Sequence, residues 1–415
     1  APPFARAMQP APSHLPMQRG RAKETPALFT PTVEFGRHQV AVIRTRQVVP
    51  GPGLPQGLAL APANSNLDVT RHDGRVYLAW RNAPGHVASR HARIHVISSA
   101  DERHWQHEVT LHRDRDVREP RLLSFGGTLR LFFAELGRDP LAFEPRGTAV
   151  WQRGRGEQWH GEPGLRWPGL MPWRTRTVGG QAHLIGYRGG EHLYAFNGEP
   201  LSIVWLSSDD GEHWRPAAPA QETVLRGGGS EADFGQLPDG SLRAVVRNEA
   251  GDDDGFGSKL CRATPDAPTD WHCRPDPRKF DSPLVFAHDG ELYLIARRNL
   301  SPSGHYAQAS HGPRASQSAA NALDYLSRRK RCALWRFTGP GPNVAFILDL
   351  PSRGDTCFAG ILKGNAPGDF IVYDYSSDLH GPDLSWYAAQ KAPSHIYRHT
   401  LRFSRRPTPT PVAQR

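Results

Sequence analysis

Two charged side chains mark the ends of a hairpin in the middle of the chain. Glu231 stands at the start of SEADFGQLPDGSLRAVVRN, and Arg247 stands near its end. The Asp239-Gly240 turn between two apolar runs predicts an antiparallel hairpin, because glycine adopts the positive φ of such a turn without steric cost. The hairpin returns the chain to its starting level, so we expect Glu231 and Arg247 to lie together. A carboxyl group beside a guanidinium is suited to acid/base chemistry.

This hairpin pattern occurs six times along the chain. The second residues of the turns are Gly74, Gly127, Gly180, Gly240, Gly290 and Gly368, with separations of 53, 53, 60, 50 and 78 residues. Such a repeat is typical of radially repeated all-β folds with about four strands per unit. We therefore predict an all-β, six-bladed β-propeller. We expect strand 38–46 to complete the last blade and close the ring, since an open ring would leave an unpaired edge.

The repeats define one domain. We expect the propeller to span residues 33–405, after a Pro-rich segment at 1–32 and before a disordered tail at 406–415. Residues 301–329 interrupt the fifth repeat and form an insertion long enough to act as a lid. No apolar run has the length of a membrane span. The opening segment lacks the apolar core of a signal peptide, and we interpret it as a processed start.

Four cysteines bear on the compartment of the protein. Cys261 and Cys273 flank a short loop between two predicted strands, and we expect them to form a disulfide. Cys332 and Cys357 are the second candidate pair. Two disulfides indicate an oxidising compartment, so we predict a secreted or periplasmic protein. Four buried free thiols in a cytosolic protein are the alternative interpretation.

The geometry of a propeller selects the remaining candidate residues. The first strand of each blade begins, and the second strand ends, on the same face of the disc. Ionisable side chains occupy these positions in several repeats, whereas the opposite turns carry few of them. We predict four catalytic carboxyl groups, namely Glu119, Glu231, Asp233 and Asp281. We predict ten substrate-binding residues, namely Arg81, His86, Arg121, Arg247, Arg297, Arg298, His305, Asp355, Tyr373 and Tyr375.

The arginines among these residues point to an anionic substrate. A guanidinium matches a carboxylate through two parallel hydrogen bonds. Several arginines around the mouth of the central channel of the propeller can therefore hold an acidic sugar. The net charge of +10 does not indicate nucleic acid, because no Lys/Arg block with interleaved aromatic residues occurs. We expect a monomer that binds an acidic oligosaccharide or polysaccharide, without a metal or other cofactor. Calcium at the acidic run 252–254 is the alternative, although the run lacks the spacing of a Ca²⁺ loop.

A motif with a structural role follows the third hairpin. LSSDDGEHW at 206–214 resembles the Asp-box of the sialidase superfamily, with Ser207, Asp209, Gly211 and Trp214 in register. In that family the Asp holds the turn between the two outer strands of a blade, and the Trp packs into the blade. ISSADERHW, which ends at Trp105, is similar to a degraded copy of this box.

The central hairpin extends the resemblance to the predicted site. Residues 230–248 are similar to the sialidase segment that carries the glutamate assisting the nucleophile and one arginine of the carboxylate-binding triad. The resemblance places these roles on Glu231 and Arg247. The chain departs from the family in two places: SNLD at 65–68 replaces the Arg-Ile-Pro motif, and TCF at 356–358 stands where the nucleophilic Tyr is expected. We therefore interpret the chain as a divergent member.

Three functions are compatible with this pattern. The first is a secreted glycosidase of sialidase-like architecture that cleaves an acidic or uronate-containing glycan. The second is a polysaccharide lyase that uses a His/Tyr pair for elimination from a uronic acid. The third is a propeller that binds a glycan or a protein without catalysis. The sequence favours the first, because carboxyl groups and arginines recur together at the predicted mouth.

Overall fold

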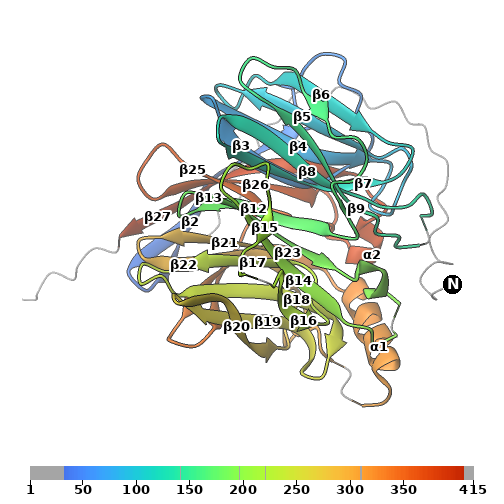
Figure 1. The fold of residues 1–415 in the computed structure, drawn as a ribbon, viewed down its shortest axis with the longest axis vertical. Coiled ribbons are helices and arrows are strands. Elements are labelled where there is room, and N and C mark those ends of the chain that lie inside the picture. The colour runs from blue at the N-terminus through green and yellow to red at the C-terminus, as the bar shows by residue number, and fades with distance from the viewer. Residues whose placement is uncertain (1–31, 141, 196, 220, 309–310, 406–415) are drawn as a thin grey trace, which may run out of the picture.

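The computed structural model describes residues 32–405, apart from 141, 196, 220 and 309–310. The tail at 406–415 and the Pro-rich segment, except its last residue, lie outside the described residues. The described chain consists of β-strands and a few short helical segments, as Figure 1 shows, and the predicted all-β class is confirmed. The helices are α1 (Arg314–Ser327), α2 (Trp386–Ala389) and the 3-10 turn η2 (Gly190–His192).

All six predicted hairpins are present as antiparallel strand pairs. They are β3 (Ala63–His72) with β4 (Arg75–Ala83), β7 (Val117–Phe125) with β8 (Thr128–Glu135), β12 (Met171–Val178) with β13 (Gln181–Arg188), β17 (Ala232–Gln236) with β18 (Leu242–Asp252), β21 (Asp281–His288) with β22 (Glu291–Asn299), and β25 (Gly360–Lys363) with β26 (Asp369–Ser377). The turn residues Asp73 and Gly74 have φ values of 44° and 73°. Positive φ at both positions is what a tight two-residue hairpin loop requires.

Further antiparallel strands extend each hairpin into a larger strand group. They are β5 (Arg93–Ser99) and β6 (Gln106–His112) in the first group; β9 (Gly147–Arg153), β10 (His160–Gly161) and β11 (Trp167–Pro168) in the second; β14 (Leu201–Ser208), β15 (Arg215–Pro216) and β16 (Thr223–Gly227) in the third; β19 (Gly255–Thr264) and β20 (Ala267–Asp276) in the fourth; and β23 (Lys330–Thr338) and β24 (Asn343–Asp349) in the fifth.

The sixth strand group joins the two ends of the described chain. Here β26 pairs with β27 (Ser394–Arg405), β27 pairs with β2 (His38–Val49), and β2 pairs with β1 (Val33–Phe35). The N-terminal strand β2 thus lies in the strand group of the sixth hairpin. A single parallel pairing of Ser394 with Ala63 connects the sixth group to the first, so the two form one nine-stranded sheet. None of the described sheets closes on itself.

A bulge near the start of the first strand recurs in several groups. Residues with positive φ lie at these irregularities: Asn66 (43°), Glu119 (55°) and Ser282 (53°), where β3, β7 and β21 shift register against their partners. Cys357, just before β25, has a φ of 79°. Bulges redirect side chains and are frequent beside functional sites. The sequence did not reveal them.

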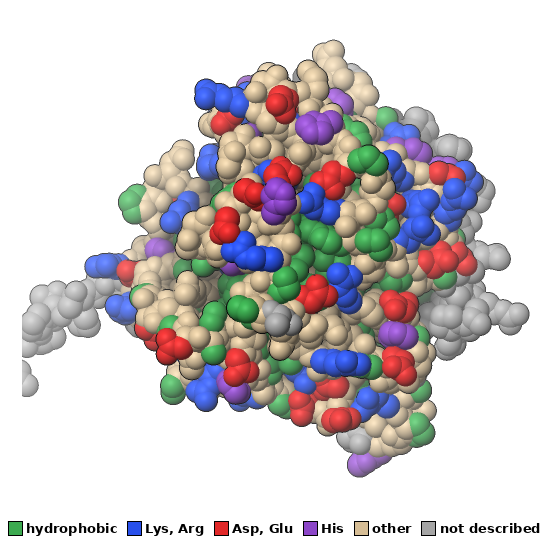
Figure 2. Space-filling view, in the orientation of Figure 1, with side chains coloured by type: hydrophobic (Ala, Val, Ile, Leu, Met, Phe, Trp, Pro, Cys, Tyr) green, Lys and Arg blue, Asp and Glu red, His purple; other side chains and the backbone are tan. Residues whose placement is uncertain are grey.

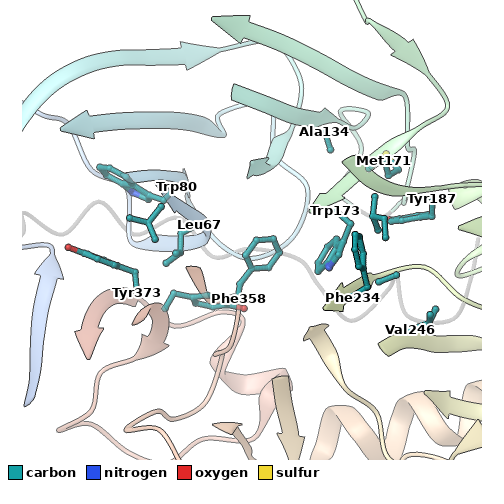
Figure 3. Close-up of a cluster of buried hydrophobic side chains, with 14 of the residues drawn as sticks. Leu67, Trp80, Ala134, Met171, Trp173, Tyr187, Phe234, Val246, Phe358 and Tyr373 are labelled. Atoms are coloured by element: carbon teal, nitrogen blue, oxygen red, sulfur yellow. The ribbon is translucent and has the colours of Figure 1, made fainter. Parts of the chain in front are cut away.

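The largest hydrophobic cluster draws its side chains from several strand groups. Figure 3 shows Trp173 between Phe358 and Phe234, with Leu67 and Tyr373 on the far side of Phe358. The rings of Trp173 and Phe358 meet edge to face, with their centroids 5.1 Å apart. Since these residues belong to different strand groups, burial of their aromatic surface holds the groups together.

The turn at 208–214 differs in register from the predicted Asp-box. Asp210, not Asp209, holds the turn: its Oδ1 accepts hydrogen bonds from the backbone N–H groups of Glu212 and His213, both at 2.8 Å. Asp209 instead contacts side chains outside the turn, with Arg215 at 2.7 Å. The indole N–H of Trp214 donates to the carbonyl of Gly211 at 2.9 Å. The position of the Asp that holds the turn is therefore corrected by one residue.

The first strand group contains the same turn. Asp101 Oδ1 accepts hydrogen bonds from the N–H groups of Arg103 and His104, both at 2.8 Å, and Ser99 Oγ donates to the same carboxylate. Trp105 follows and packs in the core. The prediction of a degraded copy is therefore wrong for the turn itself, because Asp101 corresponds to Asp210 rather than to Asp209.

Both predicted disulfides are confirmed. Cys261–Cys273 joins the neighbouring strands β19 and β20, and Cys332–Cys357 joins β23 to the segment before β25. No helix among the described residues is long and apolar enough to cross a membrane. Figure 2 shows that acidic and basic side chains are interspersed on one face of the molecule.

Removal of the Cys261–Cys273 disulfide tests its contribution to the fold. We expect the Cys261→Ser/Cys273→Ser variant to lose about 2–4 kcal/mol of unfolding free energy, because the cross-link restricts the unfolded chain. Urea denaturation monitored by tryptophan fluorescence measures the change. The variant and the wild type, both with Cys332–Cys357 intact, are compared under non-reducing conditions. Equal urea midpoints would show that this disulfide contributes nothing to stability.

Candidate functional site

A cavity of about 790 Å³ lies where the first and second strands of several groups meet. Its volume falls within the range of about 300–1,000 Å³ that is common for small-molecule sites. Six of the predicted residues line it, namely His86, Glu119, Glu231, Arg247, Arg297 and Tyr375. Starts of first strands and ends of second strands therefore meet at one cavity, as the hairpin geometry predicts.

Glu231 is held in place by two donors. It lies directly before β17, and its Oε1 is 2.8 Å from Nη1 of Arg247. Its Oε2 accepts a hydrogen bond of 2.6 Å from the backbone N–H of Ser282, which the bulge in β21 presents. Burial raises the pKa of Glu231; Arg247 opposes this shift, and the nearby carboxylate of Asp281 adds to it. Glu231 therefore has a fixed orientation and an increased proton affinity.

Glu119 approaches the same cavity from the bulge in β7. Its side chain is buried, and its Oε2 has no hydrogen-bond partner among the described residues. Burial raises the pKa of Glu119 to about 7; Arg118 opposes the shift and Glu231 adds to it. Near neutral pH a large fraction of Glu119 is thus protonated, so it can donate a proton to a molecule in the cavity.

Asp281 lies behind the cavity and remains ionised. Its carboxylate is 3.0 Å from Nη1 of Arg297 and 3.5 Å from Nζ of Lys279, and it accepts a hydrogen bond from the hydroxyl of Tyr325. Burial acts to raise the pKa of Asp281, but Lys279, Arg297 and Arg247 outweigh it and hold the pKa below its usual range. Asp281 therefore orients the cations around Glu231 and is unsuited to donate a proton.

Arg247 and Arg297, two of the arginines that line the cavity, are engaged by the chain itself. Arg247 Nη1 contacts Glu231 and also Glu249, at 3.1 Å. Arg297 donates through Nε to the carbonyl of Thr356 at 2.6 Å and through Nη1 to Asp281. These contacts fix both guanidinium groups against the cavity.

A second polar group includes a histidine and a tyrosine. Nδ1 of His86 lies 2.7 Å from Oδ2 of Asp355, and the hydroxyl of Tyr375 donates to Oδ1 of Asp355 at 2.9 Å. The indole N–H of Trp386, at the start of α2, donates to the same Oδ1 at 3.1 Å. Asp355 itself does not line the cavity, but it positions three side chains that do.

Six other predicted residues do not line the cavity. Arg81 is paired with Asp116, and Arg298 is paired with Asp349. Asp233 contacts Arg176 and the N–H of Val285, and the hydroxyl of Tyr373 donates to Glu102. The guanidinium of Arg121 lies over the rings of Trp173 and Phe358, and the backbone of His305 bridges to Arg278. These six residues lie outside the site.

The structure also adds residues that the repeat pattern did not identify. Helix α1 of the insertion lines the cavity with Leu323, Tyr325 and Leu326, and it lies beside α2, as Figure 1 shows. Tyr194, after η2, lines another part of the wall. These residues stand between the hairpins, where no periodic signal marks them.

The described residues contain one cluster with metal-ligand spacing, formed by Cys332, Cys357 and Asp374. The two sulfur atoms form a disulfide, so this cluster does not suit a metal. In the acidic run, Asp252 and Asp254 contact Lys259 at 2.8 and 2.7 Å.

Comparisons with known proteins place the fold. No family model matches the chain, and no curated protein matches it. A protein of unknown function from Dyadobacter fermentans has a similar structure, with a TM-score of 0.55 and 15% identity over 85% of this chain and 100% of that chain.

Two enzymes of known activity have a similar fold. The α-L-arabinofuranosidase of Fusarium graminearum, bound to an iminosugar inhibitor, has a TM-score of 0.51 and 13% identity over 84% of this chain and 95% of that chain. Trypanosoma rangeli sialidase, in complex with difluorosialic acid, has a TM-score of 0.50 and 11% identity over 82% of this chain and 54% of that chain. The chain thus spans about half of the sialidase. These likenesses support a sialidase-like propeller fold.

The raised pKa of Glu119 has a measurable effect on stability. Between the usual pKa of a glutamate and about 7, the folded state keeps the proton and the unfolded state releases it, so stability falls as pH rises. We expect the Glu119→Gln variant to gain about 2–3 kcal/mol relative to the wild type between pH 5 and pH 8. Urea denaturation of both proteins at the two pH values measures this. A difference that stays constant with pH would contradict the assignment.

Proposed function

We propose that the protein is a glycoside hydrolase that acts in the cavity between Glu119 and Glu231. The observation that carries the proposal is the pair of buried carboxyl groups, on different strand groups, that face one cavity with raised pKa values. Glycosidases generally use two carboxyl groups on either side of the scissile bond. The shared fold with an arabinofuranosidase and a sialidase agrees with this chemistry.

Glu119 is the general acid in this proposal. It gives its proton to the glycosidic oxygen as the bond from that oxygen to the sugar carbon breaks, and the leaving group departs as an alcohol. Glu231, oriented by Arg247 and Ser282, stabilises the developing positive charge of the sugar. Water supplies the oxygen of the new hydroxyl at the sugar carbon, and its released proton restores the acid form of Glu119.

We propose that the six strand groups are the blades of one propeller that spans residues 33–405. The six hairpins at a regular spacing and the pairing of β2 with β27 support this arrangement. The two disulfides support a secreted or periplasmic location, because such bonds persist in oxidising compartments.

We propose an acidic or uronate-containing glycan as the substrate. Arg118 and Arg247 line the cavity and supply positive charge there. Asp116 accepts a hydrogen bond from Arg118, and Glu231 and Glu249 share Arg247. A substrate carboxylate would add a further ion pair to each of these arginines.

Elimination from a uronic acid is the second candidate, and one observation favours it. His86 and Tyr375 line the cavity and share Asp355. Burial raises the pKa of Tyr375 well above its usual value, and Asp355 adds to the shift. The tyrosine would therefore donate a proton while His86 accepts one. Ultraviolet absorbance of an unsaturated product, without uptake of water, would identify this reaction.

Replacement of the general acid tests hydrolysis. On a panel of neutral and acidic glycosides we expect Glu119→Gln to lower kcat/KM by about 10²–10⁴. The wild-type rate should fall as the pH rises through about 7, where Glu119 loses its proton, and the rate of the variant should not show this fall.

Glu135→Gln is the matched control, since Glu135 is buried and paired with Arg113 outside the cavity. Turnover that survives in Glu119→Gln would refute the assignment, and ligand binding without wild-type turnover would indicate a binding protein.

The charge of the substrate is tested with pairs of glycosides that share an aglycone and differ in a single carboxylate. We expect the uronide to have the higher kcat/KM, because its carboxylate meets Arg118 and Arg247. Arg118→Gln should remove about 10- to 100-fold of this preference, the usual value of a hydrogen bond between charged groups. A higher kcat/KM for the neutral partner of every pair would exclude an acidic substrate.

A further inference from the structure

The side chains that line the cavity differ in polarity between its interior and its mouth. Glu119 and Glu231 are each only 8% exposed. The described residues include four exposed large hydrophobic side chains, and two of them, Leu323 (58%) and Tyr194 (37%), line this cavity. Charged groups therefore lie deep in the cavity, and apolar side chains are exposed where it opens.

Three segments build the apolar mouth: the stretch after β8, the stretch after η2, and helix α1. On one side Pro140 and Phe143 follow β8, and the ring of Phe143 meets that of Tyr194 edge to face, with centroids 5.2 Å apart. On the other side, Leu323 and Leu326 of α1 are three residues apart and so lie on one face of the helix. All three segments lie between predicted strands, so the mouth is formed by additions to the repeats.

We propose that this mouth is a subsite for an apolar leaving group. This narrows the acidic glycan proposed above to an acidic sugar joined to an alkyl or aryl aglycone at the bond that is cleaved. The inference rests on the proposed hydrolysis. In that reaction the sugar lies beside the deep carboxyl groups, and the group attached to the oxygen that Glu119 protonates extends towards the opening. A second sugar there would place hydroxyl groups against leucine and proline side chains, which offer them no hydrogen bonds.

An alkyl or aryl group, in contrast, matches the wall. Exposed apolar surface of this kind marks a place where another apolar surface binds. Coverage of Leu323 and Tyr194 by the aglycone removes their apolar area from water, and this gain grows with the number of carbon atoms that the aglycone buries.

Binding of a homologous series tests the subsite without any need for turnover. Butanol, hexanol and octanol, and the corresponding alkyl glucosides and glucuronides below their micelle concentrations, are titrated calorimetrically into Glu119→Gln. We expect Kd to fall about threefold to fourfold for each added CH₂. Leu323→Ser should flatten this dependence, whereas Phe346→Ser should leave it unchanged, because Phe346 is equally a large exposed side chain (42%) but does not line the cavity.

Two results would overturn the inference: a Kd that does not depend on chain length, or a dependence that survives in Leu323→Ser. The outcome is separable from that of hydrolysis. If the alcohols bind with the expected dependence while the wild type cleaves no glycoside, the apolar subsite stands and the proposed reaction fails. If glycosides are cleaved at rates that do not depend on the alkyl chain and the alcohols do not bind, the reaction stands and the apolar subsite fails.

Discussion

The arrangement of the site depends on a buried chain of alternating charges. Glu231, Arg247, Asp281 and Arg297 contact one another in this order, and they come from the fourth and fifth strand groups. Removal of one partner from such a buried pair typically costs about 3–5 kcal/mol, because the other charge is left uncompensated. The ion pairs therefore fix the fourth and fifth strand groups relative to each other. The orientation of Glu231 follows from this arrangement. Lys279, Arg297 and Arg247 outweigh the effect of burial on the pKa of Asp281, whereas burial dominates at Glu119, so the two carboxyl groups differ in proton affinity.

The bulges give this charge chain its geometry. In β21 the positive φ of Ser282 turns its N–H towards Glu231, and in β7 the positive φ of Glu119 itself lies at the shift of register. A regular strand would direct alternate side chains up and down the sheet and would not bring a backbone donor to the carboxylate. Unfavourable backbone conformations at both positions are held in place by the surrounding sheets, as is common at functional sites.

The sequence predicts the hairpins well because their turns are local. Asp-Gly and Gly-Gly pairs require no distant partner, and their positive φ follows from residue type. The site was predicted only in part. Whether a side chain lines the cavity depends on its exact position along the strand, which the repeat pattern does not give. Tyr373 and Tyr375 are two residues apart and share a face of β26, yet the first reaches Glu102 and the second reaches Asp355 at the cavity.

Simple alternation would have improved one prediction. Arg297 and Arg298 are neighbours on β22, so their side chains must point to opposite faces, and only Arg297 lines the cavity. The bulges and the walls of the insertion could not be predicted in this way. Tyr325 reaches Asp281 only because α1 packs beside α2 and β18, and nothing in the local sequence around Tyr325 encodes that contact.

The pairing of β2 with β27 has a consequence for biosynthesis. As the polypeptide emerges from the ribosome, β2 appears among the first of the described strands, and β27 follows all the others. Throughout translation an exposed edge therefore awaits its neighbour, and such edges invite association with other nascent chains. Synthesis that stops before β27 would therefore leave β2, hundreds of residues earlier in the chain, without this neighbouring strand as well.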